Sequence, residues 1–270
     1  MPAVQPCALL LLIDPDWRVE AISANVAMLG DFKPAGVVGQ PLADLIGSKA
    51  IHSLRNRLAW LAGDESEVRD FGVQWGDITL DLRAICEEGA YLIEAELAVE
   101  PRLPDGIGMV RSMSDRLSGE DPHRLAEQAV RQLASLTGFE QVMLCGRGGQ
   151  VLAASQKPIS GQTGDATSAA RLIADRDADP VPLFGDEKSE LLQRASYLAP
   201  DEELRERLAS HGIAATMILP LRIDGELVGS IQAYHASPHR CGAERRSVAH
   251  LFAERLVARM TRFGWEPSAG

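Results

Sequence analysis

The stretch IAATMILPLRIDGELVGSIQAY, residues 213–234, decides the fold class. Its two apolar runs, Ile213–Ile223 and Glu226–Tyr234, are separated by Asp224-Gly225. Two-residue hairpin turns favour this dipeptide because both positions take positive φ. The stretch therefore predicts two long antiparallel strands.

The segments around this hairpin predict more strands and helices. Asp121-Pro122 starts a helix because it supplies an N-cap acceptor followed by proline, and Gly138 ends that helix. Gln141–Cys145 and Gln150–Ala154 flank a glycine-rich turn and predict a second hairpin. Helices are expected over about 201–211 and over about 243–262, the latter with Val248, Leu251, Phe252 and Leu256 on one face.

The first hundred residues predict a separate unit. Cys7–Ile13 and Val19–Ile22 are strand-like, and apolar residues at helical spacing follow at Ile51, Leu54, Leu58 and Leu61, with Gly63-Asp64 as the stop. Three more strands are expected at Val68–Trp75, Ile78–Ile85 and Tyr91–Val99. The fold class is therefore α+β with two domains, over residues 1–105 and 120–265. Residues 101–119, rich in proline and glycine without periodicity, are the expected linker.

Charge and composition exclude several classes of protein. Apolar residues make up 46% of the 270 residues, and the net charge is −11. Residues 1–100 carry 7 basic and 16 acidic side chains, so this is not a general nucleic-acid binder. The apolar run near the start is too short for a membrane span and lacks a preceding basic region. Four scattered cysteines indicate reduced thiols, so we expect a soluble cytoplasmic protein.

The motifs for metal or phosphate binding are incomplete. Gly146-Arg147-Gly148-Gly149 lacks the lysine and hydroxyl residue of a phosphate loop. Asp175, Asp177, Asp179 and Asp186 resemble a calcium loop, but Pro180 stands where glycine is required. His235, His239 and Cys241 form a ligand-type cluster without a fourth ligand, since His211 is distant in sequence. No metal site is expected.

No catalytic residues are predicted. The sequence holds no G-x-S-x-G elbow, and no nucleophile has a histidine and carboxylate at a persuasive spacing. An enzyme with Cys145 or Cys241 as nucleophile stays an alternative. The expectation is a protein without enzymatic activity.

Several motifs resemble the photosensory module of bacterial phytochromes. The PAS-like matches are Val4-Gln5-Pro6, Ala8–Leu12, Ile22–Asn25 and Val38–Gly47; the GAF-like matches are Leu136–Phe139, Val142-Met143, Arg171–Asp175, Pro180–Leu183, Asp224–Gly229 and His235–Pro238. The resemblance covers nearly all of residues 4–260. It implies a PAS-like antiparallel sheet with helices, followed by a GAF-like antiparallel sheet with helices.

In that family, the GAF domain binds a linear tetrapyrrole. Family members attach it through a cysteine and hold it with a loop aspartate, arginines and histidines. Cys7 does not match the attachment cysteine, Leu204 stands where a pocket histidine is usual, and the loop Ser155–Ala170 is shortened. Only Arg194, Tyr234 and His235 remain as a remnant cofactor-binding set, for use only if a ligand binds.

The resemblance therefore implies a sensory or regulatory signalling module, and the missing pocket residues lead us to expect that it has lost its bilin and binds no cofactor. It would form a homodimer through the GAF helices and act on a signalling protein by conformational coupling. The alternatives are a red/far-red photoreceptor holding biliverdin and a GAF domain sensing another small ligand, such as a nucleotide. The family's third photosensory domain and kinase do not follow before Gly270, so the chain acts through partners or is a fragment.

The resemblance also implies a topological feature. In the family, the segment before the PAS domain threads a loop of the GAF domain. We expect Met1–Pro6 to pack under the loop that runs from Arg171 to about Ser196, with Val4 as the apolar plug.

Overall fold

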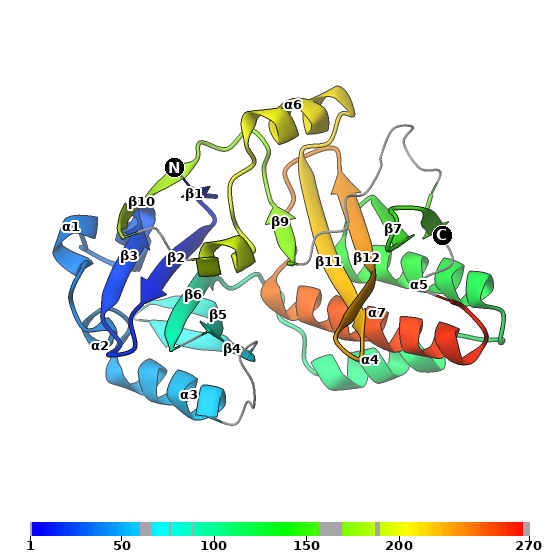
Figure 1. Ribbon diagram of the computed structural model, residues 1–270, viewed down its shortest axis with the longest axis horizontal. Coiled ribbons are helices and arrows are strands. Elements are labelled where there is room, and N and C mark those ends of the chain that lie inside the picture. The colour runs from blue at the N-terminus through cyan, green and yellow to red at the C-terminus, as the bar shows by residue number, and fades with distance from the viewer. Residues whose placement is uncertain are drawn as a thin grey trace. The chain divides into compact units, whose positions relative to one another are not determined.

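The computed structural model describes residues 2–59, 66–75, 77–87, 89–156, 169–186 and 190–266. These residues form two compact units. The first unit comprises residues 1–98 together with 178–199, and the second comprises 99–177 together with 200–270. Each unit holds one antiparallel sheet with helices, which confirms the α+β class (Figure 1).

The first unit is built on a seven-stranded sheet of order β1-β10-β3-β2-β6-β5-β4. Its strands are β1 (Ala3–Val4), β2 (Ala8–Ile13), β3 (Val19–Ser23), β4 (Ser66–Trp75), β5 (Ile78–Glu87), β6 (Ala90–Leu97) and β10 (Val181–Gly185). Its helices are η1 (Ala24–Leu29), α1 (Pro34–Val37), α2 (Leu42–Ile46), α3 (Ser48–Ala59) and η2 (Glu190–Arg194). The expected helix stop at Gly63-Asp64, with Leu61, lies outside the described residues.

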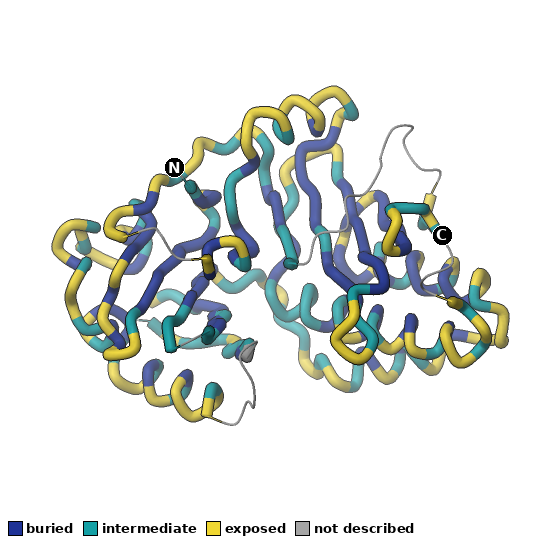
Figure 2. Tube along the Cα trace, in the orientation of Figure 1, coloured by how far each residue is buried: buried dark blue, intermediate teal, exposed yellow. Residues whose placement is uncertain are grey.

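Both faces of this sheet are covered, which explains the unbroken apolar run of β2. Leu9, Leu11 and Ile13 pack with α1, α2 and α3. Leu10 and Leu12 pack on the opposite face with Leu183, Leu191, Leu192 and other residues of the segment 178–199. All six residues of β2 are buried, as the dark tube in Figure 2 shows. A strand buried on both faces needs no polar alternation.

The N-terminal tail lies between the two arms of segment 178–199, as expected. On one side Val4 pairs with Val181 of β10. On the other side Gln5 N donates to Tyr197 O at 2.9 Å, and Ala199 N donates to Ala3 O at 2.8 Å. Val4 is fully buried, so the predicted packing of the tail under this loop is confirmed for residues 3–5.

The second unit is a five-stranded sheet of order β8-β7-β12-β11-β9 on which α5 and α7 pack, and α4 packs against α7. The strands are β7 (Gln141–Gly146), β8 (Val151–Ala154), β9 (Arg171–Ile173), β11 (Ala215–Ile223) and β12 (Glu226–His235). The helices are α4 (Gly106–Asp115), α5 (Pro122–Thr137), α6 (Glu202–Ser210) and α7 (Ala243–Arg262).

The turns and caps of this unit follow the sequence signals. Asp224 and Gly225 have φ of 50° and 83°, as the hairpin requires. Asp121 caps α5 by accepting from His123 N and Arg124 N, and Gly138 ends the helix with φ of 76°. The glycine-rich turn closes β7 onto β8 through Gly149 N, which donates to Gly146 O at 3.0 Å.

Two segments differ from the expectation. Residues 101–119 are not an irregular linker throughout, because Asp105 caps helix α4 by accepting from Gly108 N, and Val110 and Met113 bury its inner face. The predicted second domain was continuous over 120–265, whereas residues 178–199 pack with the first unit. Their strand β10 pairs with β3 through Leu183 and Ser23, a pairing between residues far apart in sequence.

Candidate functional site

The candidate site is the face of the second unit's sheet that points away from α5 and α7. Ser230, Gln232 and Tyr234 alternate along β12 and therefore share this face. Tyr234 Oη donates to Gln232 Oε1 at 2.7 Å, and Gln232 Nε2 donates to Ser230 Oγ at 3.1 Å. All three side chains are buried, so this ladder is a polar strip inside the unit.

Apolar side chains surround the polar strip. Tyr234 belongs to a buried cluster with Met143, Cys145, Ile173, Leu208 and Ile213. Leu204, at the position where the family resemblance expects a pocket histidine, packs against this cluster. Thr216 Oγ1, on the neighbouring strand opposite Tyr234, is buried without a hydrogen-bond partner among the described residues.

A small cavity of about 80 Å³ opens beside the end of this strip. It is lined by Glu140, Gln141, Gln156, Gly212, Ile213, Tyr234, His235 and Ala236. The structure therefore brings two of the predicted site residues, Tyr234 and His235, to one cavity. The shortened loop Ser155–Ala170 is described only at its two ends, since 157–168 lie outside the described residues.

His235 is held by neighbours within its own unit. Ser237 N donates to His235 Nδ1 at 3.1 Å, and the ring stacks on His239 with centroids 4.9 Å apart. Glu140 Oε1 lies 3.8 Å from His235 Nε2, and its other oxygen accepts from Ala236 N at 3.0 Å. His239 in turn contacts Thr137 O at 2.9 Å through Nε2.

Arg194 belongs to the other unit. It ends η2, which packs on β6, and its Nη1 lies 3.8 Å from Glu87 Oε2. Its carbonyl oxygen accepts from Arg83 Nη1 at 3.2 Å. Arg194 thus has partners in the first unit, whereas Tyr234 and His235 lie in the second.

The two cysteines weighed as nucleophiles are buried. Cys145 is 1% exposed, and desolvation by burial raises its pKa from 9.0 to about 11. Cys241 is equally buried, and its Sγ lies 3.9 Å from Gly242 O. A buried thiol with a raised pKa is a poor nucleophile because the thiolate is the reactive form.

The acidic loop and the histidine cluster form no metal centre in the described part of the chain. Asp177 pairs with Arg176 at 2.8 Å, and this hydrogen bond lowers the pKa of its carboxyl group. Asp175 Oδ1 accepts from Asp177 N at 2.9 Å, which makes a local turn. Among the described residues, no group of three or more histidine, cysteine or acidic side chains is arranged to hold an ion.

Comparison with protein families decides the family. The GAF domain family matches residues 121–260, and the PAS fold family matches residues 2–96. The chain belongs to the GAF domain family. The range 121–260 contains the polar strip and its cavity, so the candidate site lies in the GAF domain.

Solved structures show the same two-domain fold. The chain is similar to the photosensory core module of a phytochrome from Stigmatella aurantiaca, with a TM-score of 0.76, 18% identity, and coverage of 96% of this chain and 58% of that chain. It is also similar to the chromophore-binding domain of an unusual bacteriophytochrome from R. palustris, with a TM-score of 0.75, 20% identity, and coverage of 97% and 95%. A search of curated proteins by sequence returned no match. The chain is thus a PAS–GAF module of phytochrome-like fold that spans little more than half of the Stigmatella core.

None of the described helices combines the length and the apolar character needed to cross a bilayer.

The sequence points to Tyr234 and His235 but not to the polar strip of Ser230 and Gln232 next to them. Its signal is the alternation of Ser230, Gln232 and Tyr234 with Gly229, Ile231 and Ala233. Such alternation ordinarily indicates a solvated strand face, so the sequence alone does not reveal that this one is buried.

Proposed function

We propose that this PAS–GAF module is a sensory or regulatory part of a signal-transduction protein whose GAF domain no longer holds a bilin. It acts by conformational coupling to a partner, without enzymatic activity and without a cofactor. One observation carries the proposal. The three side chains that could hold a pigment, Arg194, Tyr234 and His235, already interact with other residues of this chain.

The size of the cavity supports this proposal. Ligand sites commonly have volumes of about 300–1,000 Å³. The space beside Tyr234 and His235 is about 80 Å³, and apolar side chains of α6 and the neighbouring strands occupy the same sheet face. A tetrapyrrole would have to displace the cluster that includes Leu208 and Ile213.

The hydrogen bonds support it as well. For a ligand to accept a hydrogen bond from the Tyr234 hydroxyl, the bond to Gln232 has to break and leave a buried amide oxygen unpaired. Each buried polar group left without a partner costs about 1–3 kcal/mol. Arg194, the remaining candidate for a propionate, lies near Glu87, which offsets its charge.

The competing function is a biliverdin-binding photoreceptor that uses Arg194, Tyr234 and His235. What favours it is that both solved structures described above are titled as phytochrome parts, one of them as a chromophore-binding domain. A GAF domain that senses another small ligand, such as a nucleotide, is the other alternative.

Addition of biliverdin to the purified chain separates these functions. We expect no structured red-shifted absorption band and no photoconversion, while the R. palustris domain under the same conditions serves as the positive control. Tyr234→Phe, which removes only the hydroxyl, should lower the free energy of unfolding without changing the spectrum. A red band that shifts in Tyr234→Phe would overturn the proposal. A thermal-shift screen with nucleotides tests the second alternative, because ligand at a hundred times its Kd adds about 2.7 kcal/mol.

The partner proposal is a homodimer through the helices of the GAF domain, with a signalling protein as the downstream partner. α4 and α7 pack against each other, and each carries an exposed apolar side chain, Ile107 and Leu251 respectively. Large exposed apolar groups on neighbouring helices are typical of interaction surfaces.

A further inference from the structure

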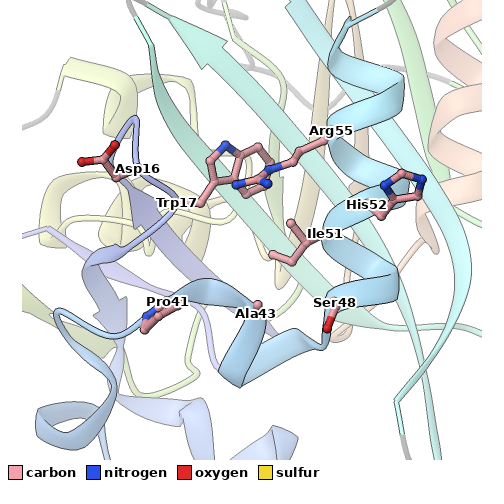
Figure 3. A pocket seen from close by; sticks show the side chains of 8 residues that line it. All are labelled: Asp16, Trp17, Pro41, Ala43, Ser48, Ile51, His52 and Arg55. Atoms are coloured by element: carbon pink, nitrogen blue, oxygen red, sulfur yellow. The ribbon is translucent and has the colours of Figure 1, made fainter.

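We infer that the PAS domain carries a binding site for a small organic monocarboxylate with an apolar body. The site is a pocket of about 470 Å³ in the first unit, far larger than the cavity of about 80 Å³ beside Tyr234. It is lined by Asp16, Trp17, Pro41, Ala43, Ser48, Ile51, His52 and Arg55 (Figure 3). This volume lies in the range of small-molecule sites.

Three elements build the pocket. The turn between β2 and β3 supplies Asp16 and Trp17, and the start of α2 supplies Pro41 and Ala43. Ser48, Ile51, His52 and Arg55 are spaced three and four residues apart, so they line it from one face of α3 (Figure 3). The wall is apolar at Trp17, Pro41, Ala43 and Ile51, which suits a hydrocarbon or aromatic body.

Trp17 is fixed as part of this wall. Its backbone has φ of 63°, a conformation that bulky residues rarely adopt. Two hydrogen bonds hold it there: Trp17 N donates to Asp14 O at 3.0 Å, and Leu42 N donates to Trp17 O at 2.8 Å. Its indole is 4.6 Å from the Tyr91 ring, and the guanidinium carbon of Arg55 lies 4.5 Å from the indole centroid. The wall is therefore preorganised, which lowers the entropic cost of binding.

Arg55 supplies the charge that a ligand would meet. The other arginines described in the first unit have oxygen partners: Arg57 pairs with Asp70, Arg69 and Arg83 with Glu67, Arg194 with Glu87, and Arg18 donates to Gly39 O. Within the described part of that unit, Arg55 is the one arginine whose guanidinium has no hydrogen bond or ion pair, and its guanidinium carbon lies over the Trp17 ring. Its planar fork matches a carboxylate with two parallel hydrogen bonds.

The other polar groups of the pocket favour a monoanion. Asp16 brings a negative charge to the same lining, which disfavours a phosphate dianion because like charges repel. His52 Nε2 lies 3.1 Å from Asn56 Nδ2, so Asn56 occupies that ring nitrogen and Nδ1 is the other polar atom of the ring. The pocket thus combines the charge of Arg55 with two further polar side chains, His52 and Ser48, and this set matches a single carboxylate.

The experiment is calorimetric titration of the full chain at pH 7.5 with phenylacetate and 4-methylpentanoate. Phenylacetamide, which has the same body without the charge, and inorganic phosphate serve as matched probes. We expect saturable binding of both carboxylates. We expect affinities lower by a factor of about ten for the amide and for phosphate, since each factor of ten is 1.4 kcal/mol.

Variants on one helix make the test specific. Arg55→Gln should weaken phenylacetate binding about ten-fold, whereas Arg57→Gln, which changes an arginine outside the pocket, should leave it unchanged. Ala43→Leu should weaken both carboxylates by filling the space without altering charge. Thermal unfolding of each variant verifies that it is folded. The inference is wrong if neither carboxylate binds, if the amide or phosphate binds as tightly, or if Arg55→Gln and Arg57→Gln lose affinity equally. None of these results depends on biliverdin, so the site and the proposed function of the GAF domain fail separately.

Discussion

At the residue scale, Glu94 joins the segment 178–199 to the sheet of the PAS domain. Its side chain is 3% exposed, and one of its oxygens accepts from Ser196 N at 2.6 Å and from Tyr197 N at 3.1 Å. The other oxygen accepts from Arg83 Nη1 at 2.6 Å. Burial alone would lower the pKa of Arg83, but Glu94 and Glu67 outweigh it, so the pKa of Arg83 is raised and its guanidinium stays charged.

Glu94→Gln should destabilise the protein by about 2–4 kcal/mol, because it leaves Arg83 with a weakened partner and puts an amide N–H where acceptors are needed. Urea unfolding measures this loss. Glu87→Gln is the matched control: its contact to Arg194 is longer and more exposed, so its loss should stay below about 0.5 kcal/mol. Equal losses in the two variants would contradict the assigned role of Glu94.

The thiols give a second prediction at this scale. With a thiol reagent at pH 8, the half-buried Cys7 and Cys86 should react in the native protein, and Cys145 and Cys241 only after unfolding. Cys86→Ser should lower the native count by one, whereas Cys145→Ser should leave that count unchanged. Native reactivity that disappears in Cys145→Ser would show that the thiol is accessible.

The raised pKa of Cys145 also predicts a pH dependence. The unfolded chain releases this proton near pH 9.0 and the folded chain near pH 11, so the folded state binds more protons in between. The stabilisation is therefore complete below pH 9 and is lost as the pH rises toward 11. The free energy of unfolding of the wild type and of Cys145→Ala, measured across pH 8–11, tests this. It should fall less steeply with pH in the variant.

At the scale of elements, the sequence predicted those whose signals are local. Asp224-Gly225 identified the β11–β12 hairpin, and Asp121-Pro122 with Gly138 identified both ends of α5. β10 was missed because Val181-Pro182-Leu183 is short and its partner, β3, is about 160 residues away in sequence. Helix α4 was missed because its glycines suggested a linker, while burial against α7 stabilises it. The sequence likewise pointed to Tyr234 and His235 but not to their partners, such as Gln232 and Glu140, because those contacts depend on tertiary packing.

The two-residue strand β1 should contribute strongly to stability, so a substitution at Val4 should have a large effect. Val4→Asp places a carboxylate in a fully buried position between Val181 and Leu198, and should cost about 3 kcal/mol or more. Hydrogen exchange should show faster exchange at Gln5 and Ala199, whose amides bond between the N-terminal tail and the arm of segment 178–199 that holds Tyr197. Val4→Ile, which keeps the apolar character, is the control. Unchanged exchange at both amides in Val4→Asp would mean that β1 does not hold the arms together.

At the scale of the whole molecule, the two domains differ in the space that they offer to a small molecule. Apolar side chains pack beside Tyr234 on the sheet face of the GAF domain, whereas the PAS domain has a pocket of about 470 Å³ that Arg55 lines. Segment 178–199 links them covalently, because it leaves the GAF sheet after β9, joins the PAS sheet as β10, and returns before α6. A ligand that stabilises the PAS domain would therefore also stabilise the strands on which this segment packs.

The proposed homodimer gives the prediction at this scale. Ile107 on α4 is 81% exposed and Leu251 on α7 is 45% exposed, and burying such side chains against a second copy removes apolar surface from water. Sedimentation over a concentration series should show a dimer whose dissociation constant rises at least about ten-fold in Ile107→Glu, because a buried unpaired charge opposes association. Phe184→Glu, at an exposed aromatic residue on β10 in the other unit, should leave the dissociation constant unchanged. A monomeric wild type, or an equal effect of the two variants, would remove α4 and α7 as the dimer surface.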